Sequence, residues 1–190
     1  MKKLALFILI LVLGLGVMNC GDDNNPTTPP IPAGCTSQGV YALSVISSNI
    51  TCKPTNAFTD TSQILGAPNF QQTGPGKTQY TGFVSLGIQG SVDVAMGSCI
   101  ADQPGPDLRV FQAVADEPVQ VLVSANQNGP FVSLGIQSCN NQCDFDLAGS
   151  GLSNIRFVRV QDGETNFACD QVGLSPGADI DAVQVLHPGT

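Results

Sequence analysis

The chain has 190 residues, with 7 Lys and Arg against 15 Asp and Glu, and its net charge is −8 at pH 7. This acidic balance disfavours nucleic acid and anionic membrane surfaces as partners, and it favours cations. Loss of Lys2 and Lys3 with an N-terminal leader would make the net charge 5 − 15 = −10, which strengthens that conclusion.

Residues 1–19 have the pattern of a signal peptide. Lys2 and Lys3 precede an apolar run over residues 4–17, which at about 14 residues is too short to span a bilayer comfortably. The run ends in VMNC, and a cysteine at this place, Cys20, resembles the lipidated cysteine of the bacterial lipoprotein lipobox. Several acyl chains on Cys20 would anchor the chain firmly in a membrane. Asn19 departs from the small residue usual before that cysteine, so an ordinary signal peptide cleaved nearby is the alternative.

Residues 20–34 predict a linker, because four prolines stand among polar residues in GDDNNPTTPPIPAG. Such a segment cannot bury apolar surface, and its semi-extended reach is roughly 40 Å. The remaining residues, 35–190, suffice for one domain with a proper core. We therefore expect a domain held away from a membrane surface.

Cysteine usage agrees with export. Six cysteines follow Cys20, and an even number in an exported chain implies disulfides, with 15 possible pairings. Closeness in sequence favours Cys139–Cys143 and Cys35–Cys52, which leaves Cys99–Cys169. The alternative is a metal site of four thiols, but CNNQC lacks the usual zinc-knuckle spacing and an oxidising compartment disfavours it.

Short runs of Val, Ile and Phe between clusters of Gly, Pro and Asn predict an all-β domain. No segment has a sustained apolar period of 3.6, so we expect only a short helical turn near residues 59–65. About eight strands with regular turns predict a single β-sandwich or jelly roll. The expected strands cover residues 40–47, 83–88, 91–96, 108–113, 119–125, 131–134, 155–161 and 180–186.

The clearest unit is a hairpin in PVQVLVSANQNGPFVSLG, where valines alternate with other residues before the turn NQNG. The heptapeptide FVSLGIQ occurs here, from Phe131, and also 48 residues earlier, from Phe83. Beyond the heptapeptide the similarity ends, whereas a repeat protein needs whole supersecondary units that recur. We expect two strands of one domain.

Three stretches in chain order resemble a known family: ILGAPN with FVSLGIQGSVDVAMG, then DQPGPDLRVFQ, then IRFVRVQDGE with GADIDAVQVL. Together they resemble bacterial exported and cell-surface proteins with a galactose-binding-like, or discoidin-like, β-sandwich, over residues 64–186. Gln112 stands where that family often has Glu, and DQPGPD replaces DGPGPD. The resemblance implies the fold and only loosely a function, because such sandwiches serve many binding roles.

Four acidic residues are candidate calcium ligands: Asp102, Asp107, Asp179 and Asp181. The first two flank the rigid turn QPGP, and the last two would point to one face of a strand, which Asp181 would share with Val183. Calcium takes six to eight oxygens from carboxylates and loop carbonyls, and the resemblance implies a structural calcium on an acid of the last strand. Alternatively, Asp181 accepts hydrogen bonds from loop amides or pairs with an arginine. The acids of CDFDLAG are a weaker second site.

Tyr80, in QQTGPGKTQY, is the best candidate for an exposed aromatic side chain on which a ligand could stack. The chain has no Trp, and most Phe lie in strand patterns. His187 is the single histidine, so a Ser-His-Asp or Cys-His site would have to use it. Because it follows the last strand, we expect a mobile side chain and a poor general base.

These patterns predict a non-catalytic binding or adhesion module of an exported, lipid-anchored bacterial envelope protein, stabilised by calcium. Its partners would be a membrane, through Cys20, and a glycan or an envelope protein. The second hypothesis is a structural envelope component that acts through protein contacts on a sheet face, and the third is a secreted hydrolase.

Overall fold

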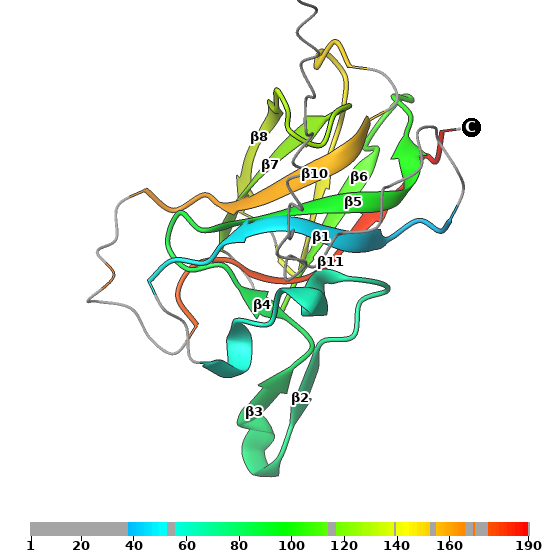
Figure 1. Cartoon of the computed structure of the whole chain (residues 1–190). Helices are drawn as coiled ribbons and strands as arrows, with labels where there is room; N and C mark the ends of the chain where they lie inside the picture. Colours follow the sequence, from blue (N-terminus) through cyan, green and yellow to red (C-terminus); the bar gives the residue numbers. More distant parts are fainter. Residues whose placement is uncertain are drawn as a thin grey trace, which may run out of the picture. The chain divides into compact units, whose positions relative to one another are not determined.

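The computed structural model describes residues 38–52, 56–113, 117–138, 140–152, 155–165, 169 and 175–189. These residues form an all-β domain in which antiparallel sheets pack around one apolar core, so the predicted β-sandwich is confirmed (Figure 1). The expected signal peptide, the linker and Cys20 lie outside the described residues. Among the residues described, no helix is long and apolar enough to cross a membrane.

The larger sheet has five strands, in the order β1 (Ala42–Asn49), β5 (Ser91–Ile100), β10 (Ile155–Asp162), β7 (Pro118–Ser124) and β8 (Val132–Ser138). The smaller sheet has four, in the order β4 (Val84–Ser85), β11 (Asp179–Val185), β6 (Leu108–Gln112) and β9 (Gln142–Phe145). A separate hairpin of β2 (Gln71–Thr73) and β3 (Gln79–Thr81) projects from the sandwich (Figure 1).

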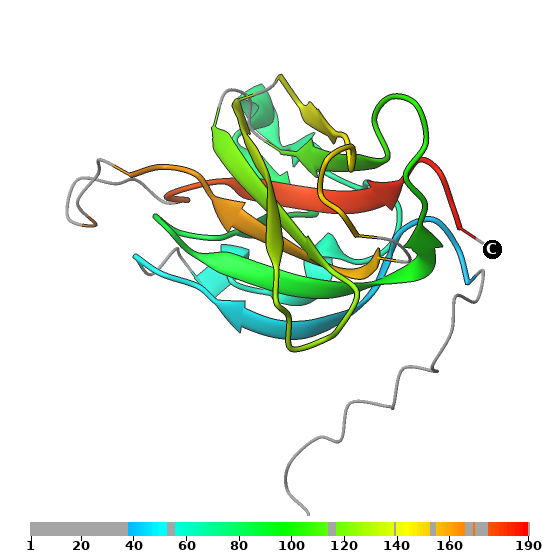
Figure 2. The same ribbon diagram turned by 90° about the horizontal axis from the view of Figure 1, so that it is seen from above.

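The core lies between the two sheets, which Figure 2 shows as two layers with β11 and β6 above β10, β5 and β1. Val94 of β5 and Val158 of β10 are fully buried from one side, and Val110 and Val183 from the other. Each such side chain stabilises the fold by about 1.5–3 kcal/mol relative to an exposed one. The core thus holds both sheets as a rigid platform for the loops at their ends.

The predicted hairpin is confirmed as β7 and β8, which pair antiparallel with Val123 opposite Val132. Val119, Val121 and Val123 are buried, while Gln120 and Leu122 between them are half-buried, as the alternation predicts. The turn closes where the amide of Gly129 donates to the carbonyl of Asn126 at 3.0 Å.

Three strands were not expected from the sequence: β2, β3 and β9. The sequences of β2 and β3, QQT and QYT, are short and polar, and all six of their residues are exposed, so no apolar alternation indicates these two strands. The sequence of β9, QCDF, does alternate, with Cys143 and Phe145 buried, but it has only four residues. The expected helical turn is present as the 3-10 helix Thr61–Ile64, which Asp60 caps by accepting a hydrogen bond from the amide of Ser62. Two further 3-10 turns span Asn56–Phe58 and Pro75–Lys77.

Both copies of FVSLGIQ include strand residues of one domain, as expected, but their surroundings are opposite. In the first copy β4 has only two residues, shorter than the expected 83–88, and residues 83–88 are all buried. In the second copy β8 is an edge strand, and Ile136 is 53% exposed. Tertiary context, not the local sequence, therefore decides whether each copy of the heptapeptide is buried or exposed.

The glycines of the two copies give a matched test of that context. Both have positive φ, +73° at Gly87 and +109° at Gly135. A Cβ on Gly87 would lie 1.8 Å from the carbonyl oxygen of Thr51, whereas a Cβ on Gly135 would meet nothing within 4 Å. We expect Gly135→Ala to lower the free energy of unfolding by about 1 kcal/mol through backbone strain alone, and Gly87→Ala by about 4 kcal/mol. Urea unfolding of the two variants measures the difference, and equal losses would contradict it.

The predicted disulfide pairing is wrong in two of its three pairs. Cys52 is bonded to Cys169, 117 residues away, and so neither Cys35–Cys52 nor Cys99–Cys169 forms. Cys99 and Cys143 are also disulfide-bonded, and Cys35 and Cys139 lie outside the described residues. The error arose because closeness in sequence was used, whereas the fold brings together the end of β1 and the connection from β10 to β11.

Candidate functional site

The predicted acidic residues do not form one cluster, because they lie at opposite ends of the smaller sheet. In the β6–β11 ladder, Val185 pairs with Leu108 at one end and Ile180 with Gln112 at the other. Asp107 precedes β6 at the first end, and Asp179 begins β11 at the second.

The first end holds Asp102, Asp107 and Asp146, whose carboxylate oxygens lie within 4.8 Å of one another. Asp107 is fully buried, and its Oδ1 accepts a hydrogen bond from the amide of Gln103 at 2.9 Å. Its Oδ2 accepts one from the amide of Leu147, also at 2.9 Å. Asp102 and Asp146 are exposed, so the donor set is three carboxylates, of which the buried Asp107 is held fixed, and it fits the preference of calcium for oxygen ligands.

His187 lies at the same end, and the expectation that it is mobile is wrong. Its Nδ1 lies 2.9 Å from Oδ1 of Asp107, and its carbonyl accepts a hydrogen bond from the amide of Ala101 at 2.9 Å. A buried carboxylate therefore orients the ring. Among the described residues, no serine or cysteine is found hydrogen-bonded to this ring.

Asp181 does not share a face with Val183, contrary to the sequence prediction. The ladder shifts register between Ile180 and Ala182, which makes Asp181 the extra residue of a β-bulge. Ile180 and Val183 consequently both join the core, three residues apart. The carboxylate of Asp181 accepts hydrogen bonds from the amides of Asn69 at 2.8 Å and Phe70 at 3.2 Å, which is the loop-amide alternative foreseen from the sequence.

Aromatic side chains gather where the β2–β3 hairpin leaves the sandwich. Phe58 stacks on Phe83 with centroids 4.7 Å apart, and Phe70 stacks on Tyr80 at 6.3 Å. Phe70 and Phe83 join the two pairs edge to face at 5.9 Å. Tyr80 is 39% exposed, as its loop position predicts, whereas Phe83 is 3% exposed. One aromatic cluster thus runs from the core to the surface.

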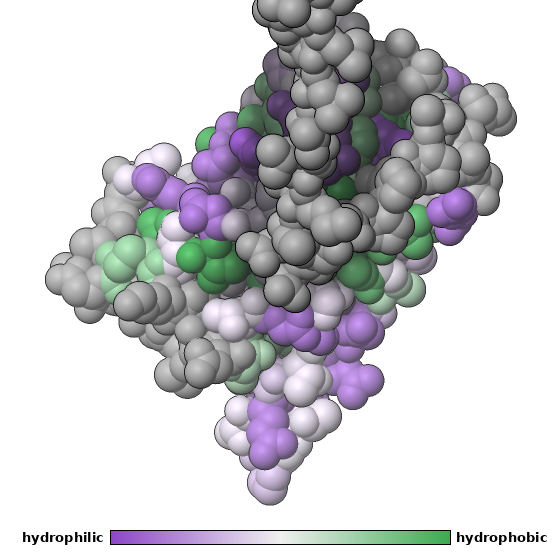
Figure 3. All heavy atoms as spheres, viewed as in Figure 1, coloured by the Kyte–Doolittle hydropathy of each residue, from purple (hydrophilic) through white to green (hydrophobic). Residues whose placement is uncertain are grey.

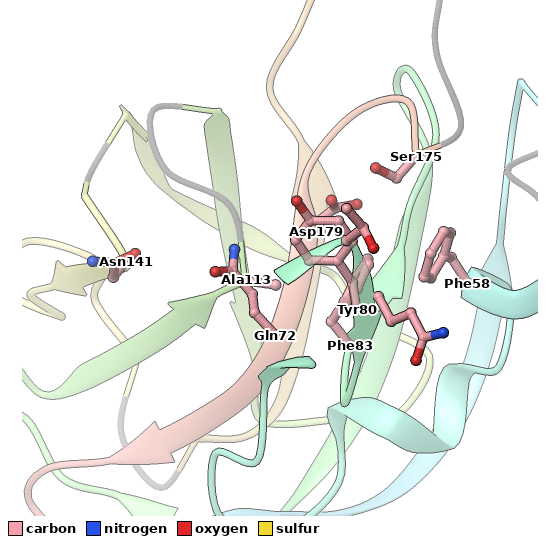
Figure 4. A pocket seen from close by; sticks show the side chains of 10 residues that line it. Phe58, Gln72, Tyr80, Phe83, Ala113, Asn141, Ser175 and Asp179 are labelled. Atoms are coloured by element: carbon pink, nitrogen blue, oxygen red, sulfur yellow. The ribbon is translucent and has the colours of Figure 1, made fainter. Parts of the chain in front are cut away.

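A pocket of about 760 Å³ opens beside this cluster (Figure 4). Phe58, Tyr80 and Phe83 form its aromatic wall, and in Figure 4 Asp179 lies at the centre of the view. The hairpin contributes polar lining, and Figure 3 shows its surface as pale to purple, the colours of intermediate to hydrophilic residues. The remaining lining residues are Gln72, Thr78, Gln79, Ala113, Asn141 and Ser175.

Asp179 is the unusual residue of the pocket. Its side chain is 1% exposed, and neither carboxylate oxygen accepts a hydrogen bond from the residues that the structure describes. The hydroxyls of Ser85 and Ser175 lie near enough to lower the pKa of Asp179 somewhat, but the hydroxyl of Ser85 donates to the carbonyl of Pro176 instead. Burial dominates and raises the pKa of Asp179 to about 7.

A second carboxylate, Glu117, lies beside Asp179. Its Oε2 accepts a hydrogen bond from the amide of Asp179 at 3.0 Å. Burial, followed by the negative charge of Asp179, raises the pKa of Glu117 to about 8. Asp162 adds to this charge, and burial raises its pKa as well. The carboxylate oxygens of Asp162 accept hydrogen bonds from the amides of Gln89 and Ala178, so Asp162 holds the chain just before β11.

Two arginines that the sequence offered as partners of Asp181 are paired elsewhere. Arg109 forms a bidentate ion pair with Asp144, at 2.6 and 2.7 Å. Arg159 forms one with Asp93, at 2.6 and 2.8 Å, and its guanidinium lies 4.5 Å from the ring centroid of Phe131. These two positive charges are therefore neutralised away from the pocket, and none of the lining residues that the structure describes is basic.

The sequence indicated Tyr80 and Asp179 as separate candidate site residues, but it gave no indication of Phe58 and Glu117. Phe58 lies in a 3-10 turn and Glu117 precedes β7, and neither shows a motif. A glutamate directly before an apolar strand was the one available signal, and it is common without any function. Compared with known protein families and with curated proteins, the chain has no match.

Proposed function

We propose that this protein is a non-catalytic ligand-binding module of an exported bacterial envelope protein, and that the ligand binds in the pocket beside Tyr80. The lipobox-like Cys20 and the linker support export and membrane anchoring; the mass of the exported chain, which lipidation of Cys20 raises, tests this part. The observation that carries the proposal is a pocket of small-molecule size that is lined both by an exposed ring, Tyr80, and by a buried carboxylate, Asp179.

A binding function is favoured over a purely structural one because the carboxylate of Asp179 is buried at the pocket. A carboxylate without a hydrogen-bond partner costs stability, and a pocket is not needed for contacts on a sheet face. Residues that destabilise the fold in a concave site are typical of ligand recognition. The absence of a nucleophile beside His187 in the described part of the chain favours binding over hydrolysis.

The test is a screen of mono- and oligosaccharides against the disulfide-bonded chain by amide chemical-shift perturbation. We expect shifts at Tyr80 and its pocket neighbours, and about tenfold weaker binding for Tyr80→Ala, because a stacking ring is lost. Tyr80→Phe keeps the ring and serves as the control, with affinity changed less than threefold. Binding that Tyr80→Ala leaves intact would place the ligand elsewhere and contradict the proposal.

Calcium is part of the proposal at the cluster of Asp102, Asp107 and Asp146. A cation bound only by the folded state raises the midpoint of thermal unfolding. We expect an increase of several degrees with 5 mM calcium over EDTA, and about no increase in Asp146→Asn, which removes an exposed ligand without touching the buried Asp107. An unchanged midpoint in the unmodified protein would mean that hydrogen bonds alone hold this cluster together.

A further inference from the structure

We propose that the ligand of the pocket carries an ammonium group, which Asp179 binds directly while the ring of Tyr80 covers the adjoining carbon skeleton. This inference rests on the proposed function and specifies its ligand as an organic cation. An amino sugar with an unsubstituted amine and a simple ring amine both have this chemistry.

The state of Asp179 is the first reason to expect an ammonium group on the ligand. The carboxylate of Asp179 is 1% exposed and accepts no hydrogen bond from the described residues, so among them it lacks what normally makes burial of a charge tolerable. Asp179 lines the pocket although its oxygens are buried, so a donor group of the ligand would approach them from the pocket side. An N–H donor with a positive charge would supply both the missing hydrogen bonds and the missing countercharge.

The negative charge around Asp179 is the second reason to expect a cationic ligand. Glu117 contacts its backbone and Asp162 lies close enough to raise the pKa of Glu117, so three carboxyl groups share this end of the sheet. Ser85 of β4, which pairs with Asp179, is neutral, as is Ala113 after β6, whose amide donates to the carbonyl of Asp179. Among the lining residues that the structure describes none is basic and Asp179 is acidic, which favours cationic over anionic ligands.

The aromatic wall of the pocket is the third reason, and it favours an organic cation. The face of an aromatic ring attracts a cation within about 6 Å, and the attraction grows when the site excludes water. Tyr80, Phe58 and Phe83 line the same pocket as Asp179. A bare metal ion would gain little from these rings, and among the described residues the group of three close acidic side chains lies at the other end of the sheet. An organic ammonium ion uses both the rings and the carboxylate.

The experiment compares cyclohexylamine with cyclohexanol, and glucosamine with glucose, as probes of the disulfide-bonded full chain at pH 7. Titration is followed by amide chemical shifts. We expect each amine to bind at least tenfold more tightly than its neutral counterpart, with shifts at Tyr80 and Asp179. Asp179→Asn should remove that preference, while Asp144→Asn, which deletes a charge paired with Arg109 away from the pocket, should keep it. The cyclohexylamine affinity should also increase from pH 6 to pH 8 as Asp179 ionises beside Glu117 and Asp162.

The outcomes separate the two proposals. Equal affinity for amine and neutral probe, with shifts in the pocket and loss in Tyr80→Ala, would overturn the ammonium inference and leave the binding function standing. An amine preference that Asp179→Asn retains would overturn it too. If no probe and no saccharide perturbs a pocket residue, both proposals are wrong. If glucosamine binds and cyclohexylamine does not, the ammonium must be carried by a sugar ring; if both bind, the ammonium and an apolar face suffice.

Discussion

Replacing both Cys52 and Cys169 by serine is expected to lower the free energy of unfolding by about 4 kcal/mol. The bond closes a loop with a sequence separation of 117, and the entropy that such a cross-link removes from the unfolded chain corresponds to roughly 3–5 kcal/mol. The loss is large because this bond ties the end of β1 to the connection between β10 and β11, which local sequence cannot hold together. Urea unfolding under oxidising conditions measures it.

The same variant has a local consequence near the pocket. Thr51, beside Cys52, donates its amide to the carbonyl of Leu86, and a Cβ on Gly177 would lie 2.5 Å from the backbone of Gly87. The segments before β5 and before β11 are therefore packed backbone against backbone next to this disulfide. The single variants Cys52→Ser and Cys169→Ser should each lose about as much stability as the double variant. A loss below 1 kcal/mol in all three would show that packing alone fixes this end of the sandwich.

The stability of the protein is expected to fall as the pH rises from about 5 to 8. Asp179 and Glu117 have ordinary pKa values of 3.8 and 4.5, and in the folded protein burial raises these pKa values to about 7 and about 8. Between the two sets of values the folded state binds more protons than the unfolded state, so the free energy of unfolding falls with increasing pH. Each proton contributes at most about 1.4 kcal/mol per pH unit, and we expect a total loss on the order of 3 kcal/mol.

The double variant Asp179→Asn, Glu117→Gln provides the control. Both substitutions keep the shape of the side chain, and the amide of Asp179 can still donate to the oxygen of Gln at position 117. The variant should be nearly independent of pH in this range and more stable than the unmodified protein at pH 8. A residual slope of the same sign is expected from Asp162 and Asp181, whose pKa values burial also raises. Stability that increases with pH in the unmodified protein would contradict the assignment.

Much of the sandwich could be predicted because its central strands obey simple rules. The valines of β7 alternate and the turn NQNG returns the chain, so local sequence and final structure agree. The hairpin of β2 and β3 could not be predicted, because QQT and QYT form no apolar pattern and are held by pairing with each other, by Asp181 and by the stacking of Tyr80 on Phe70. The bulge at Asp181 was also invisible, since one extra residue changes every later side chain to the other face.

The candidate site was harder to predict than the fold. Phe58, Tyr80, Glu117 and Asp179 come from four separate segments, and only the topology brings them to one end of the smaller sheet. The sequence shows which of these residues are charged or aromatic, but not which carboxylate loses its hydrogen-bond partners on folding. The four predicted metal ligands illustrate the same limit, because Asp102 and Asp107 lie at one end and Asp179 at the other.

Asp181 joins the β2–β3 hairpin to the sheet through the amides of Asn69 and Phe70, at the point where the chain leaves the sandwich. The edge-to-face contact of Phe70 with Phe83 holds the same base, so the place of Tyr80 on the hairpin depends on both contacts. If the proposed ligand binds beside Tyr80, weakening the Asp181 contact would leave the binding groups unchanged but would loosen the hairpin that carries Tyr80. We therefore expect the residence time of the proposed ligand to depend on Asp181, a carboxylate that is not among the described lining residues of the pocket.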